Sequence, residues 1–425
     1  MTAQTDTPPS HRPPSSRPHL AWSLSITLGL GACGSTVRLD TPPQPSPAPA
    51  ATPTAAATAS AAPSAATPPH GEQDRVQDSA QASAIAPPNV EAQSLDDTVP
   101  ADSYAGRSDA AALATELAQN LGLPRDWVWS ALSQARFQES VPRLMMPPPT
   151  PTAKNWAAYR ARFIEPTRIQ AGAQFWRTYQ DQLTRAEDTY GVPAHIIVGV
   201  LGVETQYGRN MGRYRVLDAL TTLTLDFPRG RSDRSAFFKS ELGAYLLMCR
   251  EQGLDATQVT GSFAGAIGWP QFMPSSIRKL AVDFDGDGHI DLIHNPIDAI
   301  GSVARYLAEH GWQKGQATYF GVTPPEPSEA LDTLLAPDIV PSFSAAEMAS
   351  KGATLSAAGQ RHPGLLALVQ LYNGGQPPSF VAGTVNFYAI TRYNQSSYYA
   401  LAVAQLGEAI SREVLRQNGR TPTGR

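Results

Sequence analysis

Apolar residues recur at three- and four-residue spacing through most of the chain after about Gly106. This is the period of an amphipathic α-helix, and most of these segments close on a glycine. Strand-like alternation is sparse, and 383–393 is the best candidate for a short strand pairing. The pattern therefore predicts a mainly α-helical body without internal repeats or a transmembrane segment. The predicted helical segments are 109–122, 155–191, 196–212, 236–253 and 296–311.

The segment 196–212, IIVGVLGVETQYGRNMG, differs from the others because its first eight residues are all apolar or glycine. A helix that is apolar on every side is buried within a larger body. Gly191 is a helix stop and Pro193 suits a first helical turn, so we expect the helix to begin near Pro193. With Gly208 as its terminator, Glu204 lies in the last turn.

The surroundings of Glu204 predict an unusual carboxyl group. An apolar neighbourhood and the negative end of the helix dipole both disfavour its charged form, so its pKa should be raised. A carboxylic acid that stays protonated at neutral pH is the general acid needed to cleave a glycosidic bond. The alternative is a glutamate at a helix end that points into solvent, which is the commoner case for an arbitrary glutamate.

The N-terminal part has a different composition. Thr41 to Pro100 holds 12 prolines and 16 alanines in 60 residues and no aromatic residue. Such a segment cannot bury enough apolar surface to offset its chain entropy. We therefore expect a disordered linker over 34–105, followed by one catalytic domain over 106–425.

The first 33 residues are typical of an export signal. An apolar run from Leu20 follows Arg12 and Arg17, is too short to span a bilayer, and ends in LGAC. The small residues before Cys33 resemble the lipobox of a bacterial lipoprotein, in which that cysteine is lipidated. Cleavage at another small residue, with loss of Cys33, is the alternative. Because Gly34 is not aspartate, we expect a lipid anchor at the periplasmic face of the outer membrane.

Charge and cysteine content narrow the possible partners. The net charge of −4 gives no broad basic field, so we expect no nucleic-acid partner. Two cysteines cannot form a multi-disulfide framework. If Cys33 is lipidated, Cys249 is left as an unpaired thiol, which we expect to be inert in the core.

The stretch DFDGDGHID has the spacing of an EF-hand calcium loop. Gly288 occupies position 6, and predicted helices flank the loop, the first capped by Ser275. Position 12, usually glutamate, is His294. A solvated acidic turn is the alternative, although carboxylates this close repel one another without a cation. The expected ligands are Asp283, Asp285, Asp287, the backbone carbonyl of His289, and Asp291.

Residues 261–276, GSFAGAIGWPQFMPSS, suggest the wall of a sugar-binding groove. Glycines allow a close backbone approach, Ser262 and Gln271 can bond sugar hydroxyls, and Trp269 offers a flat apolar face. A well-packed loop is the alternative. Tyr372 and Asn373, before two glycines, form either a turn or a sugar-contacting edge that faces Glu204.

From about residue 110 to 410 the chain resembles the lytic murein transglycosylase B family, through segments that include VGVLGVETQYGRNMG, GSFAGAIGWPQFMPSS, LYNGG and NFYAITRYNQSSYYALAV. The resemblance implies a lysozyme-like α+β catalytic domain with an EF-hand-like calcium loop and a helical N-terminal subdomain. It also implies that Glu204 is the single acid/base, that Arg229 and Arg231 contact the peptide stem, and that Asp298 closes the calcium loop. The glycan-binding residues that it implies are Tyr159, Ser262, Gln271, Tyr306, Tyr372 and Asn373.

The implied reaction breaks the β-1,4 bond between N-acetylmuramic acid and N-acetylglucosamine in peptidoglycan and yields a 1,6-anhydro sugar. It needs no catalytic cofactor, so calcium would be structural, and we expect a monomer that acts on glycan strands. Two alternatives stay open. One is a hydrolytic muramidase in which Asp218 or Asp226 assists Glu204. The other is a non-catalytic lipoprotein that binds glycan and calcium.

Overall fold

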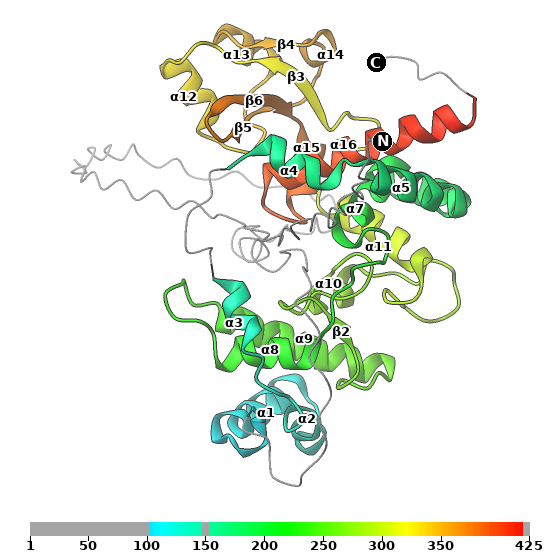
Figure 1. The fold of residues 1–425 in the computed structure, drawn as a ribbon, viewed down its shortest axis with the longest axis vertical. Coiled ribbons are helices and arrows are strands. Elements are labelled where there is room, and N and C mark those ends of the chain that lie inside the picture. Colours follow the sequence, from blue (N-terminus) through cyan, green and yellow to red (C-terminus); the bar gives the residue numbers. More distant parts are fainter. Residues whose placement is uncertain (1–101, 147–153, 420–425) are drawn as a thin grey trace, which may run out of the picture.

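The computed structural model describes residues 102–146 and 154–419, so Cys33 and most of the predicted linker lie outside the described part. In Figure 1, α1 and α2 lie at one end and a small sheet at the other, with α7, α11 and α16 between them. The helices are a 3₁₀ turn Tyr104–Gly106, α1 Ser108–Leu121, α2 Arg125–Leu132, α3 Ser140–Met145, α4 Trp156–Phe163, α5 Pro166–Thr178, α6 Gln180–Tyr190, α7 Ala194–Thr205, α8 Val216–Leu225, α9 Ser235–Gln252, α10 Pro274–Leu280, α11 Pro296–Glu309, α12 Glu329–Leu335, α13 Ala345–Ser350, α14 Ala357–Gln360, α15 Val385–Thr391 and α16 Ser397–Gln417. The strands are β1 Tyr214–Arg215, β2 Thr260–Gly261, β3 Tyr319–Thr323, β4 Thr354–Leu355, β5 Ala367–Asn373 and β6 Gln376–Gly383.

The predicted helical segment 155–191 forms three helices, α4 to α6. Pro166 is the first residue of α5, and the Glu165 side chain accepts hydrogen bonds from the next free N–H groups. A proline at this position suits a new helix and cannot continue an old one. The following break falls at Tyr179, which leaves the helical conformation.

Glycine ends the helices α1, α6 and α9 as predicted, because each is followed by a residue in the left-handed conformation. The end of α7 differs from the prediction. Pro193 caps its start as expected, but the helix stops at Thr205 and Gln206 takes the left-handed cap with φ 51°. Gly208 comes two residues later, inside a tight turn.

The strand prediction at 383–393 is wrong, because most of this segment is α15. Thr384 Oγ1 accepts hydrogen bonds from the N–H groups of Asn386 at 3.1 Å and Phe387 at 3.5 Å, which starts a helix. The sheet lies before it, in the antiparallel order β4-β3-β6-β5.

The prediction that Ser275 caps the helix before the aspartate loop is also wrong. This helix, α10, starts at Pro274 after Met273, and the Ser275 hydroxyl donates to Glu241.

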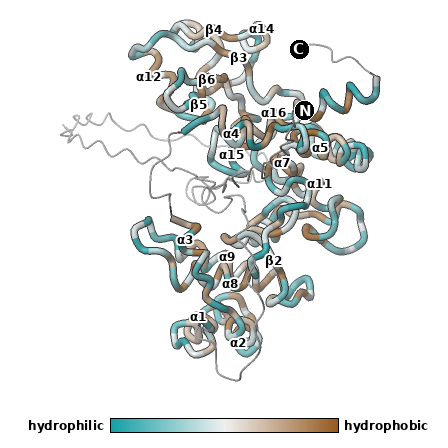
Figure 2. The backbone as a smooth tube through the Cα atoms, viewed as in Figure 1, coloured by the Kyte–Doolittle hydropathy of each residue, from teal (hydrophilic) through white to brown (hydrophobic). Residues whose placement is uncertain are grey.

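One large hydrophobic core joins the helical part, and a small second core lies under the sheet around Leu334, Met348 and Leu366. Figure 2 shows hydrophobic and hydrophilic residues alternating along most helices, as amphipathic packing requires. Cys249 is a buried free thiol, and burial raises its pKa to about 12, which agrees with an inert role. In the described part, no helix combines the length and apolarity that crossing a membrane requires.

Helices α7 and α16 pack closely because glycines face the partner backbone. A Cβ at Gly199 would lie 2.4 Å from the carbonyl oxygen of Val403. A Cβ at Gly407 would lie 2.1 Å from the carbonyl oxygen of His195. Gly199 of the apolar segment and Gly407 of α16 therefore set the spacing between α7, which carries Glu204, and α16, which carries Tyr399.

Candidate active site

Glu204 lies in the last turn of α7 and is 7% exposed. The Tyr399 hydroxyl donates a hydrogen bond of 2.5 Å to its Oε1 atom. Burial raises the pKa of Glu204 to about 8, while the hydrogen bond from Tyr399 acts in the opposite direction. The carboxyl group therefore holds its proton at neutral pH and has a nearby donor that stabilises it once the proton is lost.

Three tyrosines surround this carboxyl group. Burial raises the pKa of Tyr159, Tyr393 and Tyr399, and the negative charge of Glu204 raises all three further. Tyr393 also donates to the carbonyl oxygen of Pro270 at 2.5 Å. Tyr393 thereby holds the 261–276 segment next to the tyrosines that surround Glu204.

Tyr393 and Tyr399 were missed by the sequence reasoning, which used RYNQSSYYALAV only as part of a resemblance. A usable signal was present. Small residues and a glycine follow Tyr399 in α16, as a helix packed closely against α7 requires. A tyrosine in the first turn of such a helix is placed to reach the end of its partner.

The candidates for a second carboxylate have structural partners. Asp218 accepts a hydrogen bond from the N–H of Arg136 at 3.0 Å and lies 3.6 Å from Arg215. Asp226 accepts two hydrogen bonds from Arg107 and one from Tyr104. Over residues 102–146 and 154–419, the pKa of Glu204 is shifted by burial and by Tyr399, with no contribution from another carboxylate.

Ser262 and Gln271 lie in the 261–276 segment and are both almost fully buried. Ser262 Oγ accepts hydrogen bonds from the N–H groups of Ala264 and Ala266 in its own loop. Gln271 Nε2 donates to the carbonyl oxygens of Gly268 at 2.8 Å and Met211 at 3.1 Å. In this structure both side chains fix the shape of the segment.

The remaining predicted glycan-binding residues, Tyr306, Tyr372 and Asn373, differ in how deeply they are buried. Tyr306 is 2% exposed, donates to the carbonyl oxygen of Arg392 and packs 4.7 Å from the ring centre of Tyr393, so it supports that ring. Tyr372 is 50% exposed at the end of β5. Asn373 accepts from the N–H of Ala157 in α4, the helix that also carries Tyr159.

The two arginines proposed for the peptide stem lie in the connection after α8. Arg229 is exposed. Arg231 is half-buried and donates to the carbonyl oxygen of Met145. A separate open cavity of about 520 Å³ lies beside β1 and β2, with Arg136 and Arg215 in its lining, and does not include Glu204.

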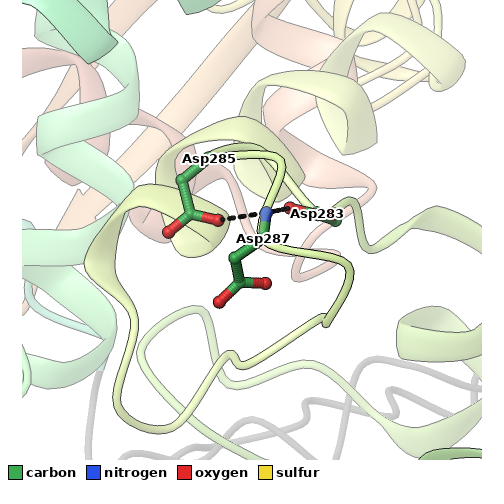
Figure 3. Close-up of side chains that lie close together, drawn as sticks. All are labelled: Asp283, Asp285 and Asp287. Carbon is green, nitrogen blue, oxygen red and sulfur yellow. Dashed lines mark hydrogen bonds between the residues drawn. The ribbon is translucent and has the colours of Figure 1, made fainter.

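The aspartate loop brings three of its predicted ligands together. Asp283, Asp285 and Asp287 each offer an oxygen, and these atoms lie within 4.8 Å of one another. Figure 3 shows them around the turn, where Asp283 and Asp285 both accept from the N–H of Asp287. Backbone N–H groups, above all that of Gly288, lower the pKa of Asp283. Carboxylate oxygens in this arrangement fit a hard divalent cation.

The remaining predicted ligands lie around this cluster. Asp298 is 0% exposed, and its carboxylate accepts hydrogen bonds from the N–H groups of Phe284 and Asp291. It therefore joins the two ends of the loop from the buried side. Asp291 accepts from the N–H groups of Ile293 and His294. His289 is exposed at the loop surface.

Comparisons with known proteins identify the family of this chain. Residues 106–408 match the transglycosylase SLT domain. The membrane-bound lytic murein transglycosylase B of Escherichia coli K12 is 41% identical over 317 residues, which are 72% of this chain and 84% of the relative. The structure of the E. coli lytic transglycosylase Slt35 in complex with calcium is 40% identical, with a TM-score of 0.65 over 73% of this chain and 95% of that one.

A more distant structure contains a bound fragment. SltB3 from Pseudomonas aeruginosa, in complex with NAG-anhNAM-pentapeptide, is 27% identical, with a TM-score of 0.61 over 72% of this chain and 80% of that one. The family match covers well over half of the chain, and the E. coli relative exceeds 30% identity across more than two thirds of it. The chain therefore belongs to the transglycosylase SLT domain family and is a peptidoglycan lytic transglycosylase with a mainly helical, lysozyme-like fold.

Proposed function

We propose that Glu204 is the single acid/base of this transglycosylase. As the acid, it gives its proton to the glycosidic oxygen, and the bond from that oxygen to C1 of N-acetylmuramic acid breaks. As the carboxylate, it then takes the proton from the C6 hydroxyl of the same sugar while that oxygen bonds to C1. The acetamido group of the substrate stabilises the positive charge at C1, and no water enters the products.

The pairing of Glu204 with Tyr399 is the observation that carries this proposal. Burial keeps the carboxyl group protonated, as the first step requires, and the Tyr399 hydroxyl stabilises the carboxylate between the two steps. Glu204 Oε2 has no hydrogen-bond partner among the described residues, so it is available to deliver the proton. Asp218 and Asp226 have partners of their own, which favours the single-carboxylate route over hydrolysis.

We also propose how glycan strands meet this site. Tyr159 and the exposed Tyr372 supply aromatic faces, and Asn373 joins the hairpin of β5 and β6 to α4. Ser262, Gln271 and Tyr306 act mainly by holding this surface in shape. Arg229 and Arg231 would contact the peptide stem, and the complex of the P. aeruginosa relative with NAG-anhNAM-pentapeptide supports the binding of a stem peptide.

The aspartate loop is proposed as a structural calcium site. Asp283, Asp285 and Asp287 would hold the ion, with Asp291, Asp298 and the carbonyl of His289 completing the set. The calcium complex of Slt35 supports this assignment. The bound ion would neutralise the clustered negative charge and so keep the loop closed.

The enzyme is proposed to work in the periplasm in association with a membrane, since its E. coli relative is a membrane-bound lytic murein transglycosylase. Lipidation of Cys33 would provide the anchor at the outer membrane, and residues 34–105 would act as the tether. A flexible chain of about 70 residues has a root-mean-square reach of roughly 45–50 Å. The catalytic domain, 106–425, would act as a monomer at that distance.

The decisive experiment compares purified wild-type protein with Glu204→Gln on cell-wall sacculi. Glutamine keeps the shape but cannot exchange the proton, so release of anhydro-muropeptides should fall by about 1000-fold or more. Glu241→Gln is the matched control, because Glu241 is also buried with a raised pKa but bonds to Ser275. Its activity should stay within a few-fold of wild type.

Mass spectrometry of the products separates the alternatives. Reducing muramic acid ends in place of anhydro ends would identify a hydrolytic muramidase. An unchanged rate in Glu204→Gln would remove Glu204 from the mechanism.

A further inference from the structure

Trp269 connects the aspartate loop to the end of α7. Its backbone N–H donates to the carbonyl oxygen of Leu292 at 2.8 Å, and its indole N–H donates to that of Ile293 at 3.1 Å. These two residues directly follow Asp291. A Cβ at Gly268 would lie 2.2 Å from the same Leu292 oxygen, so the two backbones approach closely.

On its other side, Trp269 reaches the residue next to Glu204. Its carbonyl oxygen accepts a hydrogen bond of 3.0 Å from Thr205 Oγ1, and Thr205 is 0% exposed. The same hydroxyl accepts a 3.0 Å bond from the N–H of Gly208. One buried hydroxyl therefore links the last turn of α7 both to Trp269 and to the turn that follows.

That turn is unusual and needs support. Gln206, Tyr207 and Gly208 are all left-handed, with φ of 51°, 58° and 80°. Two consecutive non-glycine residues in this region are costly and persist where the surroundings hold them. The Trp269 ring provides part of that support, since a Cβ at Gly208 would lie 2.6 Å from it.

We infer that Thr205 and Trp269 are positioning residues that fix the Glu204 carboxyl group by fastening the end of α7 to the aspartate loop. The inference rests on the proposed role of Glu204. The loop end of this connection is ordered from within, because Asp291 accepts from the N–H of Ile293 and Asp298 accepts from that of Asp291. An ordered loop thus holds Trp269, which holds Thr205.

The predicted consequence concerns the protonation of Glu204. The bonds that join Thr205 to Trp269, and Trp269 to the loop, form a brace. Without this brace, the left-handed turn can relax and water can reach the carboxyl group. Desolvation then weakens, so the pKa of Glu204 falls from about 8 towards its ordinary value. The Glu204 carboxyl group then loses its catalytic proton at a lower pH. As a result, kcat falls while KM changes little.

The first test replaces Thr205. Thr205→Val keeps the shape and loses the hydroxyl, whereas Thr205→Ser keeps the hydroxyl. We expect Thr205→Val to lower kcat roughly tenfold, as the loss of a buried hydrogen bond suggests, and to move the alkaline limb of the pH profile down by about one unit. Thr205→Ser should retain the wild-type limb. A Thr205→Val enzyme with a lower Tm but an unmoved limb and wild-type kcat would overturn the inference.

The second readout does not depend on activity. The pH dependence of the free energy of unfolding, measured with urea at room temperature, reports the proton held by Glu204 once the curve of Glu204→Gln is subtracted. In wild type, a calcium chelator should move the Glu204-dependent part of this curve to lower pH. In Trp269→Phe, which keeps the backbone bonds to Leu292 and Thr205 but loses the indole bond to Ile293, the chelator should move it less far. Equal movements in the two proteins would overturn the link to the loop.

The two proposals fail separately. If Glu204→Gln stays active on sacculi, the role of Glu204 is lost. If Glu204→Gln is inactive but Thr205→Val keeps the wild-type pH profile and Trp269→Phe responds to chelator as the wild type does, only the inferred role of Thr205 and Trp269 is lost.

Discussion

Glu204 and Asp283 carry the same functional group in opposite settings. Glu204 is buried, has one phenol as its hydrogen-bond partner, and has a pKa raised to about 8. Asp283 is partly exposed, accepts backbone N–H groups from Gly286, Asp287 and Gly288, and has a lowered pKa. The first carboxyl group can therefore exchange a proton near neutral pH, while the second is a permanent anion suited to a cation. Local solvation and donors decide the role, not the residue type.

After the loss of activity in Glu204→Gln, the largest expected effect is on the pH dependence of stability. It tests the contrast between Glu204 and Asp283. Between the unfolded pKa of about 4.5 and the folded value of about 8, the folded state holds a proton that the unfolded state has released. The free energy of unfolding should therefore fall as pH rises through this window, by up to about 1.4 kcal/mol per pH unit, and level off above it.

Glu204→Gln supplies the control for this prediction because glutamine does not titrate. Other buried acids, such as Glu241, contribute to both proteins and cancel in the difference. Urea unfolding from pH 5 to 9 should give curves that separate by roughly 3–5 kcal/mol, with the wild type losing more. Parallel curves would mean that Glu204 is hydrated and that the contrast with Asp283 is false.

The next effect concerns the aspartate loop, where charge rather than desolvation dominates. A cation at 100 times its dissociation constant stabilises the folded state by about 2.7 kcal/mol. For a domain of about 320 residues, chelation should therefore lower Tm by roughly 4 °C. Asp283→Asn should lower Tm in the same way and remove most of the response to chelator, which differential scanning calorimetry can measure.

A matched comparison keeps this prediction specific to the loop. Asp255→Asn changes another exposed aspartate that bonds only within its own turn, to Thr257. Its Tm should respond to chelator as the wild type does. If Asp283→Asn responds as fully as Asp255→Asn does, the loop does not hold the ion.

The sequence predicted the parts of the molecule that depend on local pattern. The burial and helical position of Glu204 followed from an apolar run that ends in one carboxylate, and the acidic cluster followed from regular spacing. Glycine and proline also marked the ends of α6 and the start of α7.

The remaining features depend on contacts between distant segments. Tyr399 lies 195 residues from Glu204 along the chain, and only the close packing of α7 on α16 brings the two together. The α15 segment was mistaken for a strand because its apolar residues suit either period, and a side-chain cap from Thr384 decided the outcome. Ser262 and Gln271 were predicted to line a sugar-binding groove, but both are buried, and their bonds to Ala266 and Met211 are tertiary details that composition does not encode.

The smallest effect follows from removing the hydroxyl that holds Glu204. Tyr399→Phe loses the hydrogen bond that lowers the pKa of Glu204, so that pKa should rise by about one unit and the alkaline limb of activity should move up. This direction is opposite to that expected for Thr205→Val, which lets water in. Because the carboxylate between the two chemical steps loses its stabilising donor, kcat should also fall roughly tenfold.

Tyr398→Phe is the control for Tyr399→Phe, since Tyr398 is the neighbouring tyrosine and donates instead to the carbonyl oxygen of Tyr372. It should leave the alkaline limb in place. A downward shift in Tyr399→Phe would mean that water replaces the hydroxyl and solvates the carboxylate better than the phenol does. In the wild type, the Tyr399 hydroxyl would then act by keeping water away from Glu204 and not by stabilising the carboxylate, so the proposed role of its hydrogen bond would be lost.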